Sequence, residues 1–226
     1  MLIYEELRRI VGDDDDVLDV GTKDGRHLDG VSGDVYALDL GPDPRLPTVT
    51  YVRGDGCALP FNDGSFDYVV SNQVLEHVRD KDRILDEIHR VLRPDGTFLV
   101  SFPNRLFPGN PHDLPPFFSL LPRRVGQLAS QLLDAERRAY YREHVFNLSP
   151  LLARKLLGSR FGQVEYVTAS LVGRHRHIYA DSQSGQLLMT LYPLIRLLTS
   201  TGPGARAFEL LFGYSAYRCS RPSHST

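Results

Sequence analysis

Residues 17–25 read V-L-D-V-G-T-K-D-G, and the rest of the chain is organised around this stretch. A short apolar run ends at Gly21 and Gly25 follows four residues later, which is typical of a buried parallel strand that turns tightly into a loop. Because glycine has no Cβ atom, such a turn lets a nucleotide-like ligand approach unpaired main-chain N–H groups. Neither the phosphate loop G-x-x-x-x-G-K-[ST] nor the dinucleotide pattern G-x-G-x-x-G occurs here, so neither class is indicated.

Further apolar runs, separated by helical patterns or extended crossovers, predict more strands. We expect strands at residues 17–20, 35–39, 48–53, 66–71 and 97–102, then at 163–169 and 214–219. Helical spacing of apolar residues predicts helices at 2–11, 74–78, 84–92 and 150–157. Strands that alternate with crossovers imply a parallel α/β sheet covered on both faces.

The expected strand ends carry polar or glycine residues. Gly21, Asp39, Asp55 and the pair Ser71-Asn72 each follow an apolar strand. Ligands of parallel sheets bind beyond the carboxyl ends of the strands, so these residues are expected to meet in one crevice.

Length and composition favour one soluble domain. The chain has 226 residues, and 26 basic against 28 acidic side chains give a net charge of −2, so no positive field indicates a nucleic-acid partner. Cys57 and Cys219 lie far apart and form no metal or disulfide pattern, so no metal site is expected. No apolar run reaches the roughly 18 residues of a spanning helix, and we expect a cytoplasmic protein.

Several motifs, in their order and spacing, resemble the class I S-adenosylmethionine-dependent methyltransferases of the small-molecule type. The matching pieces are V-L-D-V-G at 17–21, A-L-D at 37–39, G-D-G at 54–56, L-P-F to S-F-D within 59–67, V-L-E-H at 74–77 and R-V-L-R-P-D-G at 90–96. The resemblance covers most of residues 15–170. It implies a doubly wound, Rossmann-like sheet of about seven strands whose last strand is antiparallel.

The resemblance also implies a cofactor, S-adenosyl-L-methionine, and residues that hold it. Asp19 resembles the acid near the amino group, Asp39 the acid that accepts the ribose hydroxyls, and Asp55 the acid near the adenine amine. The other residues that the resemblance places around the cofactor are Gly21, Gly25, Leu40, Gly56, Cys57, Ser71 and Asn72.

Lys23 departs from the family pattern, which usually has glycine at this place. A lysine favours negative φ values, so we expect an altered turn, or else a lysine that pairs with the cofactor carboxylate. A lysine that simply points to solvent is an equal alternative.

Residues 105–148 interrupt the alternation of strands and helices with many prolines, and we interpret them as a lid over the acceptor. His112 and His144 in this insert are the candidate catalytic bases, since the free pKa of histidine lies close to neutrality. His77 is a candidate with a structural role as its alternative. The expected organisation is a single domain over 1–226, with a core at 12–104 and 149–220 and a leucine-rich helical insert at 183–212.

The insert resembles methyltransferases that act on glycans, glycolipids or isoprenoid-linked acceptors, so a small-molecule or saccharide- or lipid-linked acceptor is expected. Basic residues 174–177 and the leucine-rich insert leave two further interpretations open, a peripheral membrane contact and a homodimer. Two alternative functions also stay open: a quinone or polyprenyl C-methyltransferase, and a non-catalytic methyltransferase-like subunit.

Overall fold

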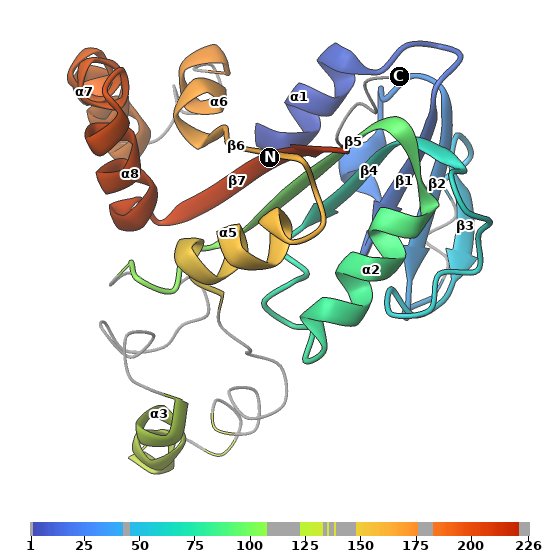
Figure 1. The fold of residues 1–226 in the computed structure, drawn as a ribbon, viewed down its shortest axis with the longest axis horizontal. Helices are drawn as coiled ribbons and strands as arrows, with labels where there is room; N and C mark the ends of the chain where they lie inside the picture. Colours follow the sequence, from blue (N-terminus) through green and yellow to red (C-terminus); the bar gives the residue numbers. More distant parts are fainter. Residues whose placement is uncertain are drawn as a thin grey trace.

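A seven-stranded sheet in the order β3-β2-β1-β4-β5-β7-β6 forms the centre of the molecule in this computed structural model (Figure 1). The structure describes residues 2–42, 46–107, 123–132, 135, 138, 148–175 and 183–221. The strands are β1 Asp16–Val20, β2 Asp34–Asp39, β3 Thr50–Arg53, β4 Phe66–Asn72, β5 Leu92–Pro103, β6 Gln163–Tyr166 and β7 Tyr214–Ser220.

The first five strands are parallel, and β7 runs antiparallel to both of its neighbours, β5 and β6. The predicted doubly wound sheet with an antiparallel last strand is therefore confirmed. The chain reverses its direction of winding between β1 and β4, so the carboxyl ends of these two central strands diverge at a crevice.

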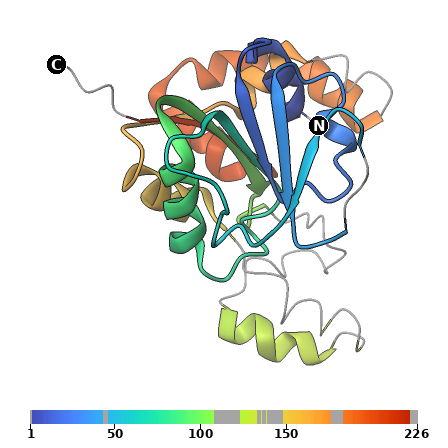
Figure 2. The ribbon, with the colours of Figure 1, turned by 90° about the vertical axis from the view of Figure 1, so that its right-hand side faces the viewer.

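Helices cover both faces of the sheet. They are α1 Leu2–Ile10, the short η1 Arg26–Leu28, α2 Lys81–Val91, α5 Pro150–Gly158, α6 Thr168–Arg174, α7 Gln183–Thr199 and α8 Gly202–Leu211, with α3 Arg123–Ala129 and η3 Ser130–Leu132 in the insert. α2 and α5 lie on one face, and α1 and α6 lie on the other (Figures 1 and 2). None of the described helices is long and apolar enough to cross a bilayer.

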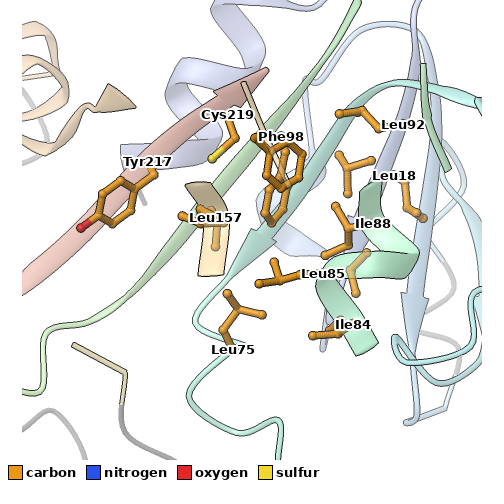
Figure 3. Close-up of a cluster of buried hydrophobic side chains, with 14 of the residues drawn as sticks. Leu18, Leu75, Ile84, Leu85, Ile88, Leu92, Phe98, Leu157, Tyr217 and Cys219 are labelled. Atoms are coloured by element: carbon orange, nitrogen blue, oxygen red, sulfur yellow. The ribbon is translucent and has the colours of Figure 1, made fainter. Parts of the chain in front are cut away.

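The larger apolar cluster joins α2 and α5 to the sheet. Ile84, Leu85 and Ile88 of α2 lie with Leu18 and the other labelled side chains of Figure 3, all buried. A second cluster packs Ile3 and Leu7 of α1 against the opposite face. Each fully buried leucine or isoleucine contributes about 1.5–3 kcal/mol, so these clusters fix the strand ends that carry the polar residues.

Local structure differs from the sequence prediction in three places. Residues 74–78 form single hydrogen-bonded turns rather than a helix, because Gln73 adopts a left-handed φ of 58° and α2 starts only after the N-cap Asp80. β5 begins at Leu92, directly after α2 and before the strand expected at 97–102. β6 ends at Tyr166, because the Thr168 side chain accepts the Ala216 N–H at 2.8 Å where a strand carbonyl would.

Candidate functional site

A pocket of about 410 Å³ opens beyond the carboxyl ends of β1, β2 and β4. Its lining comes from α1, the loop after β1, the end of β2 and the segment after β4: Tyr4, Gly21, Thr22, Lys23, Asp24, His27, Asp39, Asn72, Gln73, Val74 and His77. This volume is in the range of small-molecule and cofactor sites. Four predicted residues, Gly21, Lys23, Asp39 and Asn72, therefore meet in one pocket, as their positions at the strand ends indicated.

The turn after β1 requires glycine at its first position. Gly21 has a φ of 83°, its N–H donates to the Leu38 carbonyl at 2.7 Å, and a Cβ atom there would lie 2.3 Å from Val74 Cγ2. Any larger side chain would push Val74 out of the pocket wall. The backbone of this turn therefore lies directly on the pocket surface.

Lys23 keeps the conformation that a glycine would adopt. Its φ is 57°, and its main-chain N–H donates to Asp39 Oδ2 at 2.8 Å. The expectation of an altered turn is therefore wrong in this respect: the lysine takes the left-handed conformation, at a cost of about 1–2 kcal/mol. The hydrogen bond to Asp39 helps to hold it there.

Asp39 is positioned by two main-chain donors. Oδ2 accepts from Lys23, and Oδ1 accepts from the Gly41 N–H at 2.8 Å. Asp39 lines the pocket, whereas Leu40 beside it is 67% exposed. The two N–H groups fix the orientation of the carboxylate.

Asp19 is buried behind the pocket on β1. The Tyr4 hydroxyl lies 3.1 Å from both carboxylate oxygens and donates to them, and no salt bridge to Asp19 occurs within the described ranges. Burial raises the pKa of Asp19 to about 7, although the hydrogen bond from Tyr4 partly offsets this effect. A buried acid without a cationic partner is a frequent mark of a ligand site.

The end of β3 lies beside the end of β2, next to the pocket. The Gly54 N–H donates to the Asp39 carbonyl at 3.0 Å, and Asp55 Oδ1 accepts the Cys57 N–H at 2.9 Å. A Cβ atom on Gly56 would lie 2.9 Å from Ile84 Cδ1, so this turn also passes close to α2. Asp55, Gly56 and Cys57 do not line the pocket, so their contact with the cofactor stays a prediction.

The end of β4 reaches the pocket through Asn72, while Ser71 before it does not line the pocket. Ser71 is fully buried, and its Oγ has no hydrogen-bond partner among the residues that the structure describes. Asn72 Oδ1 accepts from Ser101 Oγ at 2.5 Å and from the Tyr214 hydroxyl at 3.2 Å. Asn72 is therefore fixed by β5 and β7.

Tyr4, His27 and Glu76 escaped the sequence reasoning, whereas His77 was a candidate. Tyr4 stacks on His27 with ring centroids 5.3 Å apart, and both line the pocket. Glu76 is buried, its carboxylate has no hydrogen-bond partner in the described segments, and burial raises its pKa to about 8. Its Oε1 lies 4.0 Å from Nε2 of His77, which lines the pocket. The motif V-L-E-H at 74–77 contains Glu76 and His77, and its position after β4 was the only signal in the sequence that Glu76 lies near the pocket.

The two predicted bases, His112 and His144, lie outside the described residues, as does most of the insert at 105–148. Their role stays a prediction. Gly25 lies near the pocket, with a φ of 64°, and caps η1.

Comparisons with known proteins identify the family. A family model described as a methyltransferase domain matches residues 18–100, which run from β1 to within β5 and so include the glycine turn, Asp39 and Asn72. A Mycolicibacterium smegmatis protein named as an S-adenosylmethionine-dependent methyltransferase is 39% identical over 129 residues, covering 51% of this chain and 49% of the relative. The chain belongs to the class I S-adenosylmethionine-dependent methyltransferases.

Two further similarities concern a curated relative and a solved structure. The ubiquinone/menaquinone biosynthesis C-methyltransferase UbiE of Shewanella oneidensis is 31% identical over 170 residues, 66% of each chain. A solved complex of the Trm112 methyltransferase activator with a methyltransferase from Haloferax volcanii shares the fold, with a TM-score of 0.58, 18% identity, and coverage of 98% of this chain and 89% of that chain. The methyltransferase chain spans about half the length of its mycobacterial relatives.

The pocket fits the cofactor of this family, S-adenosyl-L-methionine. The lining offers the carboxylate of Asp39 and the bare turn at Gly21. Asp19 and the Ser71 hydroxyl, which lacks a hydrogen-bond partner among the described residues, are buried on the neighbouring strands β1 and β4. The volume of about 410 Å³ also suits a ligand of this size.

Proposed function

We propose that this chain binds S-adenosyl-L-methionine in the pocket and transfers its methyl group to a small-molecule or saccharide- or lipid-linked acceptor. The observation that carries the proposal is Asp19, a buried carboxylate beside the glycine turn that has no cationic partner within the described ranges. The ammonium group of the cofactor supplies the missing positive charge.

The residues at the other strand ends bind different parts of the cofactor. Asp39, oriented by two N–H groups, accepts hydrogen bonds from the ribose hydroxyls. Asp55, Gly56 and Cys57 border the adenine, with Leu40 as an exposed apolar side chain next to it. The backbone of Gly21 and the side chain of Lys23 face the methionine end, where the lysine ammonium can pair with the cofactor carboxylate.

When bound, the cofactor supplies an electrophilic methyl group on a sulfonium. The contribution of the chain is mainly to position the acceptor in line and to exclude water. Ser71 and Asn72 form the floor of that region, and Asn72 is held by Ser101 and Tyr214. His77, with Glu76 near its Nε2, joins His112 and His144 as a candidate to accept an acceptor proton.

A quinone or polyprenyl C-methyltransferase is the second candidate. The similarity to UbiE over 66% of each chain favours it. An aromatic carbon acceptor activated by its own hydroxyl groups needs less help from a base, so this candidate predicts that loss of His77, His112 or His144 has little effect on turnover.

Two measurements test the proposal. Titration calorimetry should show binding of S-adenosylmethionine and S-adenosylhomocysteine, and Asp39→Ala should weaken both by about 1.5–3 kcal/mol, the range for hydrogen bonds to charged groups. Transfer of a radiolabelled methyl group to pooled saccharide, lipid-linked and quinone acceptors then separates the acceptor classes. Absence of cofactor binding by the folded protein would refute the proposal, and binding without transfer to any acceptor would support the non-catalytic alternative.

A further inference from the structure

The helical hairpin of α7 and α8, residues 183–211, carries several leucines whose side chains are largely exposed. Leu191, Leu194 and Leu198 of α7 are 45%, 54% and 52% exposed, and Leu197 is 67% exposed. The spacing of the first three, i, i+3 and i+7, places them on one face of the helix. Leu211, at the end of α8, is 72% exposed.

The hairpin is anchored by small residues instead of these leucines. A Cβ atom on Gly173 of α6 would overlap the Tyr192 ring of α7, and one on Gly204 of α8 would lie 1.9 Å from the Leu198 carbonyl oxygen. The two glycines therefore let α6, α7 and α8 pack closely through the backbone. Figure 1 shows the hairpin at the end of the sheet farthest from β3.

The charges of this surface have one sign. Arg196 and Arg206 are exposed and form no ion pair among the described residues. Glu209 is the only acidic residue between positions 183 and 221, and it is buried. Arg154 binds it at 2.6 and 2.8 Å, and the Tyr217 hydroxyl donates to it at 2.5 Å, so its charge does not reach the exposed face.

We propose that the α7–α8 hairpin docks this protein on an anionic membrane surface, with its leucines in the interface and Arg196 and Arg206 against lipid phosphates. Exposed leucines beside arginines, with no exposed carboxylate, are typical of helices that lie in the plane of a negatively charged bilayer. A second copy of the chain fits less well, because a two-fold interface would bring arginines toward arginines without an acid to pair them. Arg206 also lines a hollow of about 270 Å³ with Leu151, Leu210 and the paired Arg154 and Glu209.

The hairpin is joined directly to the pocket end of the sheet. Asn104, which follows β5, donates through Nδ2 to the Leu210 carbonyl at 2.9 Å and the Phe212 carbonyl at 2.8 Å, at the end of α8. Tyr214, two residues after Phe212, donates its hydroxyl to Asn72 Oδ1 in the pocket. A docked hairpin would therefore hold the pocket rim near the lipid surface. The docking itself does not depend on the proposed methyl transfer.

Vesicle cosedimentation of the full chain tests the proposal. We expect binding to phosphatidylcholine vesicles that contain phosphatidylglycerol, weaker binding to phosphatidylcholine alone, and partial release by salt. Leu194→Glu combined with Leu198→Glu should lower the partition at least about tenfold. Arg196→Gln and Arg206→Gln should each lower it about fivefold on anionic vesicles only. Leu132→Glu, at a leucine that is 90% exposed in η3, is the matched control and should bind like the wild type.

Two results would overturn the proposal. One is the absence of binding to anionic vesicles, or binding that the leucine pair does not change although circular dichroism shows the variants folded. The other is a dimer in analytical ultracentrifugation that the leucine pair dissociates, without vesicle binding, which would assign the surface to a second copy. Cofactor titration of the same variants should be unchanged, so failure of docking and failure of the proposed function are separable.

Discussion

Two carboxylates, Glu6 on α1 and Asp19 on β1, are each 1% exposed, but their hydrogen-bond partners differ in charge. Glu6 accepts hydrogen bonds from Arg9, Arg174 and Arg218 at 2.5–3.2 Å. Asp19 accepts instead from the uncharged hydroxyl of Tyr4, and none of the described arginines or lysines forms an ion pair with it.

The pKa values follow from this difference. Burial alone would raise the pKa of Glu6, but the hydrogen bonds from Arg9 and Arg174 lower it to about 2. Burial raises the pKa of Asp19 to about 7. A buried acid that is satisfied by arginines serves the fold, because it ties α1 to α6 and β7, whereas a buried acid without a cation is free to receive one from a ligand.

The largest expected effect comes from removing the paired acid. Glu6→Ala should lower the free energy of unfolding by about 3 kcal/mol, at the low end for a broken buried ion pair, because the three arginines are partly exposed and can rehydrate. Urea denaturation measures this loss. Glu5→Ala, which breaks the partly exposed pair with Arg8, is the control and should cost less than about 1 kcal/mol. Equal losses in the two variants would contradict the structural role of Glu6.

Removing the charge of Asp19, which has no cationic partner among the described residues, should change the free energy of unfolding in the opposite direction. Between its ordinary pKa of 3.8 and its folded pKa of about 7, the folded protein holds a proton on Asp19 that the unfolded chain has released. Stability from this group is therefore present at low pH and is lost as the pH rises to about 7. Asp19→Asn should raise the free energy of unfolding near pH 8 by about 2 kcal/mol, since the amide carries no charge to desolvate. A loss of stability at that pH would count against the unpaired state.

Cofactor affinity should depend on pH in the same range. The ammonium group binds the ionised form of Asp19, so the affinity should fall by up to about tenfold for each pH unit below about 7 and stay level above it. Calorimetric titrations across this range measure the profile. His27 also lines the pocket, and burial lowers its pKa, so it too gains charge on acidification. Asp19→Asn separates the two: a profile that persists in this variant belongs to His27.

The smallest effect concerns Tyr4. Burial and the neighbouring Asp19 raise the pKa of Tyr4 well above its usual value, so its hydroxyl stays a donor at every pH of interest. Tyr4→Phe removes a hydrogen bond that favours ionised Asp19. We expect the midpoint of the affinity profile to move up by less than about one pH unit, the equivalent of one hydrogen bond. An unchanged midpoint would show that Tyr4 does not tune the acid.

Local patterns made most of the core and the pocket predictable. The apolar runs at β1, β2 and β4 are bounded by glycine or acid, and parallel strands bring their carboxyl ends to one edge, so Gly21, Asp39 and Asn72 could be placed together from the sequence. The helix expected at 150–157 likewise matches α5, Pro150–Gly158.

Long-range pairing could not be predicted from the sequence. Glu6 and Arg174 are 168 residues apart, and Glu6 and Arg218 are 212 apart, so no local spacing announces the cluster. Arg174 and His175, two of the basic residues interpreted as a membrane contact, instead face Glu6. The left-handed conformations of Lys23 and Gln73 also escaped prediction, because non-glycine residues adopt them only where neighbouring hydrogen bonds hold the backbone.

The most direct test of the unpaired acid is a calorimetric titration of the wild type and Asp19→Asn with S-adenosylhomocysteine near pH 8. This ligand keeps the ammonium group and lacks the reactive methyl. We expect the variant, folded and no less stable, to bind about ten to a hundred times more weakly, because it has lost a charge-assisted interaction. Equal affinity of the two proteins would contradict the assignment of Asp19 as the partner of the cofactor ammonium.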